Sequence, residues 1–229
     1  MFNSTESTED VSLSLTVSLE IRRHSTQLPW TYSALDQRQR EIADQVRAGH
    51  AGTLLVSEVA PIVTRGRRTP ESDVAEDHLA SRFGIPVYST DRGGFATYHG
   101  PGQWVLFPVD RLERLTGDRL GVKKTVEALL EIACQVGRLY EPKVTIRKGN
   151  ELGVWTPRGK FAAVGVHVSQ GVLLHGLSVN GFRTPTSFVG LRPCGLDSPV
   201  DFLLPEASDL EFEKLKDSLI STTLKTLWH

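Results

Sequence analysis

Apolar and polar residues alternate almost without interruption over Val11–Arg22, close to the start of the chain. A period of two predicts a β-strand with one buried face and one face in contact with water. Residues 1–10 are polar and acidic, and they have neither the basic region nor the apolar region of a signal peptide. We therefore expect a disordered tail over residues 1–10 and a single folded domain over residues 11–229.

Apolar residues recur at helical spacing in three longer segments, Thr31–Ala48, Val122–Leu139 and Ser208–Trp228. The segment Val122–Leu139 gives the clearest pattern, because its apolar residues form a continuous stripe typical of a helix packed on a core. Cys134 falls within this segment. A lone cysteine there indicates packing, since free cysteines are among the most buried residue types.

Shorter apolar runs, bounded by glycine, proline or basic turns, predict further strands. These are Thr53–Val59, Pro61–Thr64, Ile85–Ser89, Trp104–Val109, Val144–Arg147, Leu152–Trp155, Phe161–Ser169 and Val172–Asn180. Pro70–Phe83 is expected to be a loop with a short helix around Glu76–Arg82, and Phe182–Pro205 to be irregular. Helices interspersed with hairpin-like strands, without strict alternation, indicate an α+β fold with a mixed sheet.

The most unusual stretch is Asp91–Gln103, which reads Asp-Arg-Gly-Gly-Phe-Ala-Thr-Tyr-His-Gly-Pro-Gly-Gln. Glycines at this density allow the backbone to approach a ligand closely, and the polar side chains could be directed at it. A long hairpin turn is the alternative, since Gly-Pro-Gly is common in turns. The stretch matches neither the dinucleotide-binding nor the P-loop glycine pattern, which disfavours a simple phosphate-binding loop. Strands predicted on both sides of it suggest a position at the edge of a sheet.

The composition fits a soluble globular protein, with 39% hydrophobic and 23% charged residues in a chain of 229. A net charge of −1 gives no overall attraction to nucleic acid or membranes, and no apolar run reaches the length of a transmembrane helix. Two cysteines provide no disulfide framework, and no spaced Cys and His residues suggest a metal site. We expect a protein of the reducing cytoplasm.

Cys194 lies in the motif Arg-Pro-Cys-Gly-Leu, where proline and glycine would hold its backbone in a tight loop. It could be a small buried residue or a nucleophile. A nucleophilic cysteine needs a nearby cation, because the thiolate is the reactive form. His99, His175, Lys160 and Arg192 are the candidates.

Lys160 begins a predicted strand, where a lysine is usually a solvated surface charge. The residues around it and on the following strand are small, among them Ala162, Ala163, Gly165 and Gly176. Two strands with small residues at their centres could form a groove for a narrow apolar chain. His175 lies on the second of these strands, and it is either a hydrogen-bonded core histidine or a catalytic one.

Four blocks together resemble the lipoyl(octanoyl) transferase family, the octanoyl-[acyl-carrier-protein]:protein N-octanoyltransferases. They are Arg92-Gly-Gly-x-x-Thr-Tyr-His-Gly-Pro-Gly-Gln103, Gly159-Lys160-x-Ala-Ala-x-Gly165, His175-Gly-Leu-x-x-Asn180 and Pro193-Cys194-Gly195. The Gly66-Arg67-Arg68-Thr69 turn is also similar, and the resemblance runs from about Pro29 to Leu204. It implies the fold of biotin and lipoate protein ligases, related to class II aminoacyl-tRNA synthetases: a mixed sheet with packed helices and a small second sheet.

The resemblance also implies an acyltransferase reaction in lipoate biosynthesis and protein lipoylation. An octanoyl group passes from octanoyl-acyl carrier protein to a lysine of lipoyl domains, those of 2-oxoacid dehydrogenase complexes and the glycine cleavage H protein. Cys194 matches the nucleophile that carries the acyl thioester, and Lys160 matches the residue that lowers its pKa and accepts a proton. The residues matching the acyl-substrate site are Arg92, Gly93, Gly94, Phe95, Ala96, Thr97, Tyr98, His99, Ala163, Val164, Gly165, Gly176, Leu177 and Ser178. No metal or cofactor of the chain itself is implied, since 4'-phosphopantetheine is carried by the donor.

Two departures from the family pattern are visible. Arg65 stands where the family usually has an apolar residue. Val200-Asp201-Phe202-Leu203 replaces the usual Val-Thr-Ser-Leu, which changes the hydrogen bonding expected after the cysteine.

Three alternatives remain open. The chain could be an ATP-dependent lipoate or biotin ligase of the same fold, or an amidotransferase that moves octanoyl between lipoyl domains. It could also be a domain that only binds carrier protein, although binding alone requires neither Cys194 nor Lys160. Basic residues could meet the acidic partner proteins, although a solvated surface explains them equally well. These residues are Arg65, Arg67, Arg68, Lys123, Lys124, Arg147 and Lys148.

Overall fold

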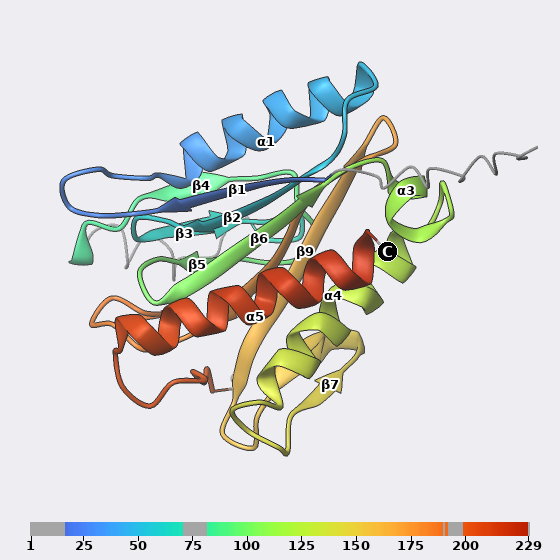
Figure 1. Ribbon diagram of the computed structural model, residues 1–229. Helices are drawn as coiled ribbons and strands as arrows, with labels where there is room; N and C mark the ends of the chain where they lie inside the picture. Colours follow the sequence, from blue (N-terminus) through green and yellow to red (C-terminus); the bar gives the residue numbers. More distant parts are fainter. Residues whose placement is uncertain (1–16, 71–81, 190, 192–198, 229) are drawn as a thin grey trace, which may run out of the picture.

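The computed structural model describes residues 17–70, 82–189, 191 and 199–228. Within these residues, a seven-stranded sheet has helices on both faces and a three-stranded sheet beside it (Figure 1). The strand order of the large sheet is β1 (Ser18–Arg23), β2 (Thr53–Glu58), β6 (Gln103–Val109), β10 (Val172–Asn180), β9 (Lys160–Ser169), β8 (Gly153–Trp155) and β7 (Thr145–Arg147). Strands β1 and β2 are parallel, and the other neighbouring pairs are antiparallel.

The small sheet has the order β4 (Val87–Ser89), β3 (Ile62–Arg65) and β5 (Thr97–His99). The helices are α1 (Tyr32–Arg47), α3 (Leu112–Thr116), α4 (Val122–Gly137) and α5 (Asp209–Leu227), with a short 3-10 turn at Gly149–Glu151. Helix α1 packs on one face of the large sheet, and α4 and α5 cover the other (Figure 1). The expected α+β fold with a mixed sheet and a small second sheet is confirmed.

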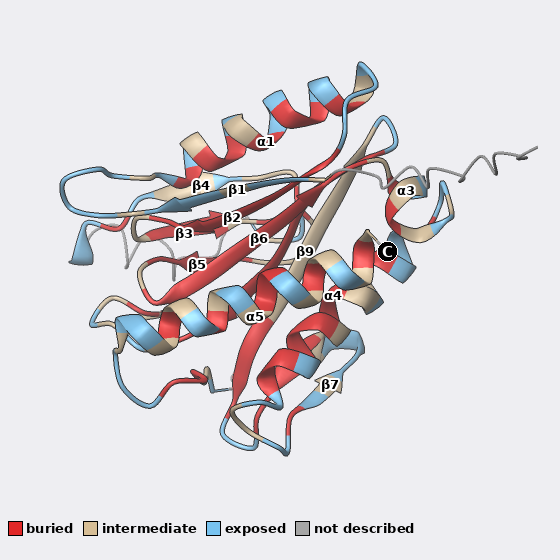
Figure 2. Ribbon diagram, in the orientation of Figure 1, coloured by how far each residue is buried: buried red, intermediate tan, exposed pale blue. Residues whose placement is uncertain are grey.

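Strand β6 shows why the large sheet is buried on both faces. Trp104 and Leu106 belong to the core beneath α4 and α5, whereas Val105 and Phe107 belong to the core beneath α1. Successive side chains of a strand point to opposite faces, so a continuous apolar run fills both cores. All of β6 is buried (Figure 2).

The helices form where their apolar stripes and caps predict them. The Thr31 hydroxyl accepts a hydrogen bond of 3.2 Å from the Ala34 amide and so caps α1. Gly49, with a positive φ of 100°, follows the end of α1. In α4, Cys134 is only 1% exposed, and burial raises the pKa of its thiol. The predicted packing role of Cys134 is confirmed. None of the helices among the described residues is both long and apolar enough to cross a bilayer.

The first strand differs from its prediction. Only its second half, β1, lies in the described residues, and it forms the edge of the large sheet next to β2. Leu19 and Ile21, expected on a buried face, are 45% and 42% exposed. The reason is that α1 packs mainly over β6 and β10 and leaves the outermost strand uncovered.

Three short elements were missed by the sequence patterns. The glycine-rich stretch Asp91–Gln103 is not only a turn, because it contains β5, a strand of the small sheet. Helix α3 and the 3-10 turn at Gly149–Glu151 were also not predicted. The short helix expected around Glu76–Arg82 falls almost wholly outside the described residues.

Candidate functional site

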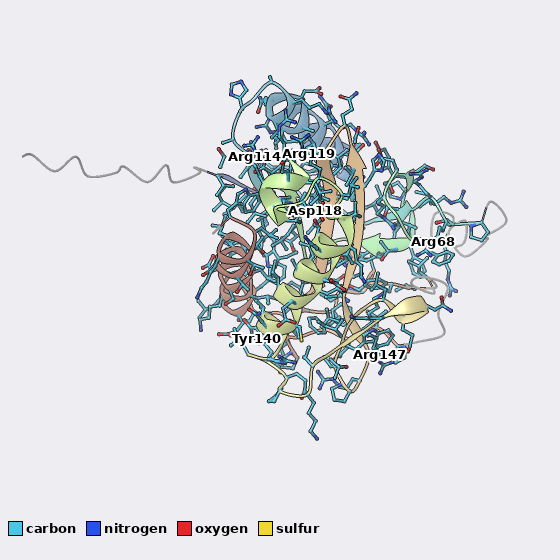
Figure 3. The ribbon with its side chains drawn as sticks, turned by 90° about the vertical axis from the view of Figure 1, so that its right-hand side faces the viewer. Arg68, Arg114, Asp118, Arg119, Tyr140 and Arg147 are labelled. Atoms are coloured by element: carbon cyan, nitrogen blue, oxygen red, sulfur yellow. The ribbon has the colours of Figure 1, made fainter. Side chains whose placement is uncertain are left out.

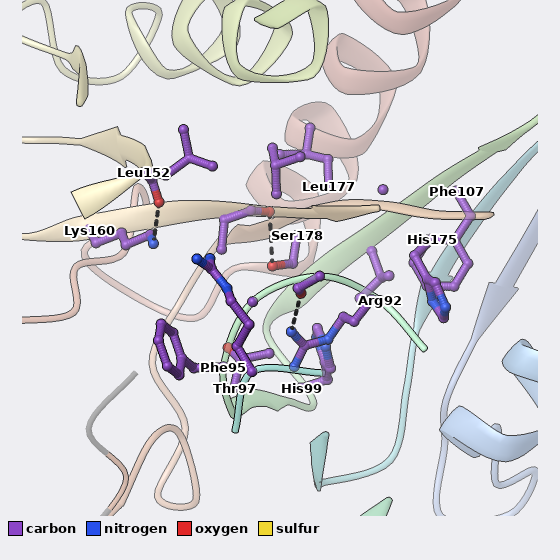
Figure 4. A pocket seen from close by; sticks show the side chains of 18 of the residues that line it. Arg92, Phe95, Thr97, His99, Phe107, Leu152, Lys160, His175, Leu177 and Ser178 are labelled. Carbon is purple, nitrogen blue, oxygen red and sulfur yellow. Dashed lines mark hydrogen bonds between the residues drawn. The ribbon is translucent and has the colours of Figure 1, made fainter. Parts of the chain in front are cut away.

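A cavity of about 130 Å³ lies between the glycine-rich stretch and the neighbouring strands β9 and β10. Leu152 and Lys160 line one end of it, and Phe107 and His175 lie at the other end of the row of side chains (Figure 4). Tyr32 of α1 also contributes to its wall. The cavity therefore joins segments that are far apart in the sequence.

Most of the residues predicted to contact an acyl substrate line this cavity. From the glycine-rich stretch these are Arg92, Gly93, Gly94, Phe95, Thr97 and His99, and from β9 and β10 they are Ala163, Val164, Gly165, Gly176, Leu177 and Ser178. Ala96 and Tyr98 do not line it. They lie instead in the core beside the small sheet, because alternate side chains of β5 and of the extended residue before it point in opposite directions. The Tyr98 hydroxyl lies 2.8 Å from the Thr186 hydroxyl.

Ala163, Gly165 and Gly176 line the cavity, and the two glycines also allow close packing of the chain around it. A Cβ on Gly165 would stand 3.2 Å from the Gly93 carbonyl oxygen, so this glycine lets the glycine-rich stretch approach β9. A Cβ on Gly176 would stand 2.2 Å from the Leu106 carbonyl oxygen, so this glycine is required for strand packing. Ala162 belongs to the core beneath α4 and lines only a smaller neighbouring hollow.

Arg92 fixes the shape of the glycine-rich turn. It is 7% exposed, and its Nη2 donates to both the carbonyl oxygen and the hydroxyl of Thr64 at 2.8 Å. Its Nη1 donates to the Gly93 carbonyl at 3.1 Å. The guanidinium thus joins β3 to the turn, and each charge-assisted bond is stronger than a neutral one.

His99 is held by a row of amides that also determines which ring nitrogen carries the proton. Asn180 Nδ2 donates to the Asp201 carbonyl at 3.1 Å, and Asn180 Oδ1 accepts from Gln103 Nε2 at 2.8 Å. Gln103 Oε1 is then left to accept from His99 Nδ1 at 2.6 Å. His99 Nε2 is therefore the unprotonated nitrogen in this wall of the cavity. Burial and the nearby Arg92 charge lower the pKa of His99 to about 3, which keeps the ring neutral.

His175 anchors the start of the glycine-rich stretch to β10. Its Nε2 lies 2.6 Å from Asp91 Oδ1, and this hydrogen bond is the main cause that holds the pKa of Asp91 well below its usual range. Its Nδ1 lies 3.2 Å from Gln39 Nε2, and its backbone amide donates to Gln39 Oε1 at 2.7 Å. His175 is 1% exposed, so the structure favours the hydrogen-bonded core histidine of the two interpretations.

Lys160 is not a solvated surface charge. It is 8% exposed, and its Nζ donates a hydrogen bond of 2.6 Å to the Leu152 carbonyl (Figure 4). Gly153 leaves the space that the lysine side chain occupies, since a Cβ there would stand 2.2 Å from Lys160 Cε. A lysine ammonium is therefore built into the cavity wall by the strands around it.

Cys194 lies outside the described residues. The described chain resumes five residues later, at Pro199, whose carbonyl accepts a hydrogen bond of 2.9 Å from the Lys160 amide. The chain after the Pro193-Cys194-Gly195 motif is thus tied to the backbone of Lys160.

Three of the basic residues that could meet acidic partner proteins have local contacts within the chain. Arg68 lines the cavity with its guanidinium 5.0 Å from the ring of Phe95. Arg147 pairs with Glu151 at 2.8 Å, and Lys124 pairs with Asp118 at 3.3 Å. Arg68 and Arg147 lie toward the side of the molecule away from α5 (Figure 3).

Sequence reasoning missed Tyr32, Val105, Phe107 and Leu152 as cavity residues. The first three lie in elements with ordinary core patterns, so nothing local distinguishes them. The stacking of Tyr32 on His99, with ring centres 5.2 Å apart, appears only once α1 and β5 are placed together.

Comparison with known proteins shows the family of the chain. Residues 32–223 match the family model for the lipoyl protein ligase A/B catalytic domain. An octanoyltransferase of Mycolicibacterium smegmatis is 35% identical over 200 residues, which cover 84% of this chain and 82% of the relative. An octanoyltransferase of Alkaliphilus metalliredigens is 38% identical over 167 residues, covering 71% and 70%.

Among solved structures, lipoate-protein ligase A bound with ATP has a TM-score of 0.65 at 13% identity, covering 92% of this chain and 84% of that one. A putative lipoate protein ligase from T. acidophilum has a TM-score of 0.66 at 14% identity, covering 91% and 84%. The similarity to these two solved structures shows the fold, and the octanoyltransferase relatives show the family. The chain belongs to the octanoyltransferases of the lipoyl protein ligase A/B catalytic-domain family.

Proposed function

We propose that this enzyme transfers an octanoyl group from the phosphopantetheine thioester of acyl carrier protein to a lysine of a lipoyl domain, with Cys194 as the intermediate carrier. The observation that carries the proposal is Lys160, a buried ammonium in the cavity wall whose backbone is bonded to the segment that follows Cys194. The octanoyltransferase relatives, at 35% and 38% identity, support the octanoyl group as cargo.

In the first step, the Cys194 thiolate attacks the thioester carbonyl of the donor. A new S–C bond forms at Cys194, and the bond to the phosphopantetheine sulfur breaks. The Lys160 ammonium stabilises the thiolate before attack and gives its proton to the departing sulfur. This step exchanges one thioester for another, so it changes the free energy little.

In the second step, the neutral amine of the acceptor lysine attacks the acyl group on Cys194. A C–N bond forms, the S–C bond breaks, and Lys160, now neutral, accepts the proton of the amine. The Cys194 thiolate and the Lys160 ammonium are thereby restored. Conversion of a thioester to an amide is downhill, so the reaction as proposed requires no ATP and no cofactor of the enzyme itself.

The cavity suits the acyl chain. Leu152, Val164 and Leu177 give it apolar walls, and each methylene buried there contributes about 0.8 kcal/mol to binding. Thr97 and Ser178 add polar groups to the wall on the side of Lys160, where both also line the smaller neighbouring hollow.

The proposal is tested by comparing donors. Octanoyl-acyl carrier protein without ATP should support octanoylation of a purified lipoyl domain, whereas octanoate with ATP should not. A requirement for ATP would instead indicate a ligase. Faster transfer from an octanoylated lipoyl domain than from carrier protein would indicate an amidotransferase with the same cysteine chemistry.

A further inference from the structure

Asp201 occupies one of the two places where the chain departs from the family pattern. Its side chain is 14% exposed and faces the turn that leads into β9. It accepts a hydrogen bond from the Thr156 hydroxyl, and its carboxylate pairs with the Arg158 guanidinium at 3.0 Å. A threonine at this position could not form that ion pair, because it carries no charge.

The turn held by Asp201 is bonded within itself. The Thr156 hydroxyl accepts from the amides of Arg158 at 3.0 Å and Gly159 at 3.3 Å, while the Thr156 amide donates to the Gly159 carbonyl at 2.9 Å. Thr156 is 2% exposed, so these bonds are buried. The Asp201 carboxylate therefore binds a hydrogen-bonded turn, residues 156–159, that ends one residue before Lys160.

The backbone of Asp201 is bonded to Lys160 as well. The Asp201 amide donates to the Lys160 carbonyl at 2.9 Å, and the Lys160 amide donates to the Pro199 carbonyl at 2.9 Å. Gly159 allows this close approach, since a Cβ there would stand 2.4 Å from the Pro199 carbonyl oxygen. Two backbone bonds thus join the segment 199–201 to the start of β9, and the Asp201 side chain joins it to the turn before β9.

We infer that Asp201 is a positioning residue, which holds the start of β9, and with it Lys160, against the segment 199–201 that follows Cys194 in the sequence. The inference rests on the proposed cysteine chemistry. It assigns a role to a residue that the family resemblance left without one. Without the Asp201 side chain, Lys160 should remain in β9, but its ammonium should stabilise the Cys194 thiolate less.

The test measures the pH dependence of Cys194 alkylation by iodoacetamide, followed by mass spectrometry of peptides, in the full chain without substrate. Cys134 is buried and serves as the internal reference. The variants are Asp201→Ala, Asp201→Thr with the residue usual in the family, and Lys160→Met. Arg158→Gln removes the ion pair but keeps the hydrogen bond from Thr156.

We expect Lys160→Met to move the midpoint of alkylation upward and Asp201→Ala to move it in the same direction by about one pH unit, which is roughly tenfold slower alkylation at neutral pH. Asp201→Thr should restore most of the wild-type midpoint, because its hydroxyl can pair with Thr156, and Arg158→Gln should give a smaller shift than Asp201→Ala. Melting temperatures check that each variant is folded.

An unchanged midpoint in folded Asp201→Ala, while Lys160→Met shifts it, overturns the positioning role and leaves the proposed function standing. If Asp201→Ala does not fold, the other two variants decide. The positioning role is overturned if the midpoint is unchanged in Arg158→Gln and if, in Asp201→Thr, it shifts as far as in Lys160→Met. An unchanged midpoint in Lys160→Met overturns the proposed pair of cysteine and lysine itself, and the role of Asp201 with it.

Discussion

Gly153 and Lys160 lie so close together that a methyl group on Gly153 would stand 2.2 Å from Lys160 Cε and 2.9 Å from its Nζ. Gly153 also has a positive φ of 152°. The glycine therefore defines the path of the lysine side chain across the sheet. Any larger residue must displace the lysine side chain and also the Ala162 carbonyl of β9, which would stand 2.7 Å from the added methyl group.

Gly153→Ala should consequently slow octanoyl transfer by roughly 10- to 100-fold, because a shift of about 1 Å in a reacting group has an effect of this size. Initial rates with saturating octanoyl-acyl carrier protein measure it. Gly49→Ala is the matched control, since Gly49 also has a positive φ, of 100°, but no atom lies within 4 Å of the added methyl. Equal rates in the two variants would show that Gly153 does not act through Lys160.

The bond between His175 and Asp91 should contribute to stability. In Asp91→Ala, the buried His175 ring loses its 2.6 Å partner, and we expect the free energy of unfolding to fall by about 1–3 kcal/mol. Urea unfolding measures the change. Asp44→Ala is the control. It removes the ion pair between Arg47 and the Asp44 carboxylate, which is 75% exposed, and it should change the free energy of unfolding by less than about 0.5 kcal/mol. A loss no larger in Asp91→Ala than in this control would contradict the anchoring role.

His99 should make stability depend on pH. Its pKa is lowered from 6.5 to about 3 on folding, so below pH 6.5 the unfolded chain binds a proton that the folded chain does not. The contribution of His99 to the free energy of unfolding is therefore fully present above pH 6.5. It is lost as the pH decreases toward 3, by up to about 1.4 kcal/mol per pH unit.

The measurement compares wild type with His99→Gln in urea at pH 5, 5.5 and 6, where most carboxylates remain ionised. We expect a shallower slope in the variant. Parallel slopes would mean that His99 is not kept neutral by burial.

The two cysteines should respond oppositely to substitution. Cys134→Ala removes a buried thiol from α4, so we expect a loss of about 1 kcal/mol in stability with nearly unchanged transfer. Cys194→Ala should abolish transfer and leave the melting temperature close to that of wild type. An active Cys194→Ala enzyme, or an inactive but folded Cys134→Ala enzyme, is incompatible with the proposed mechanism.

Much of the fold could be predicted because its elements have strong local patterns. Strand β6 and helix α4 are long apolar segments with clear period, and both form where expected. Strand β5 was missed because it has three residues and lies between glycines. The exposure of Leu19 and Ile21 was missed because burial of a strand depends on which helix covers it, and alternation alone does not specify that.

The candidate site was predicted in its residue types more than in its geometry. The motif residues around Arg92 and Lys160 do meet at one cavity. The burial of Ala96 and Tyr98 in the core beside the small sheet depends on how β5 is placed in that sheet, and the tautomer of His99 depends on amides from two other strands. Asp201 was visible as a departure from the family, but its partners Thr156 and Arg158 come from another turn.

The central claim is that the octanoyl group passes through Cys194 with Lys160 beside it. Mass spectrometry of the enzyme after brief incubation with octanoyl-acyl carrier protein, in the absence of a lipoyl domain, tests this most directly. We predict one octanoyl adduct, sensitive to hydroxylamine, on the peptide that contains Cys194, and slower formation of the same adduct in Lys160→Met. An enzyme that transfers octanoyl without forming any adduct, or that carries it on Cys134, would contradict the account.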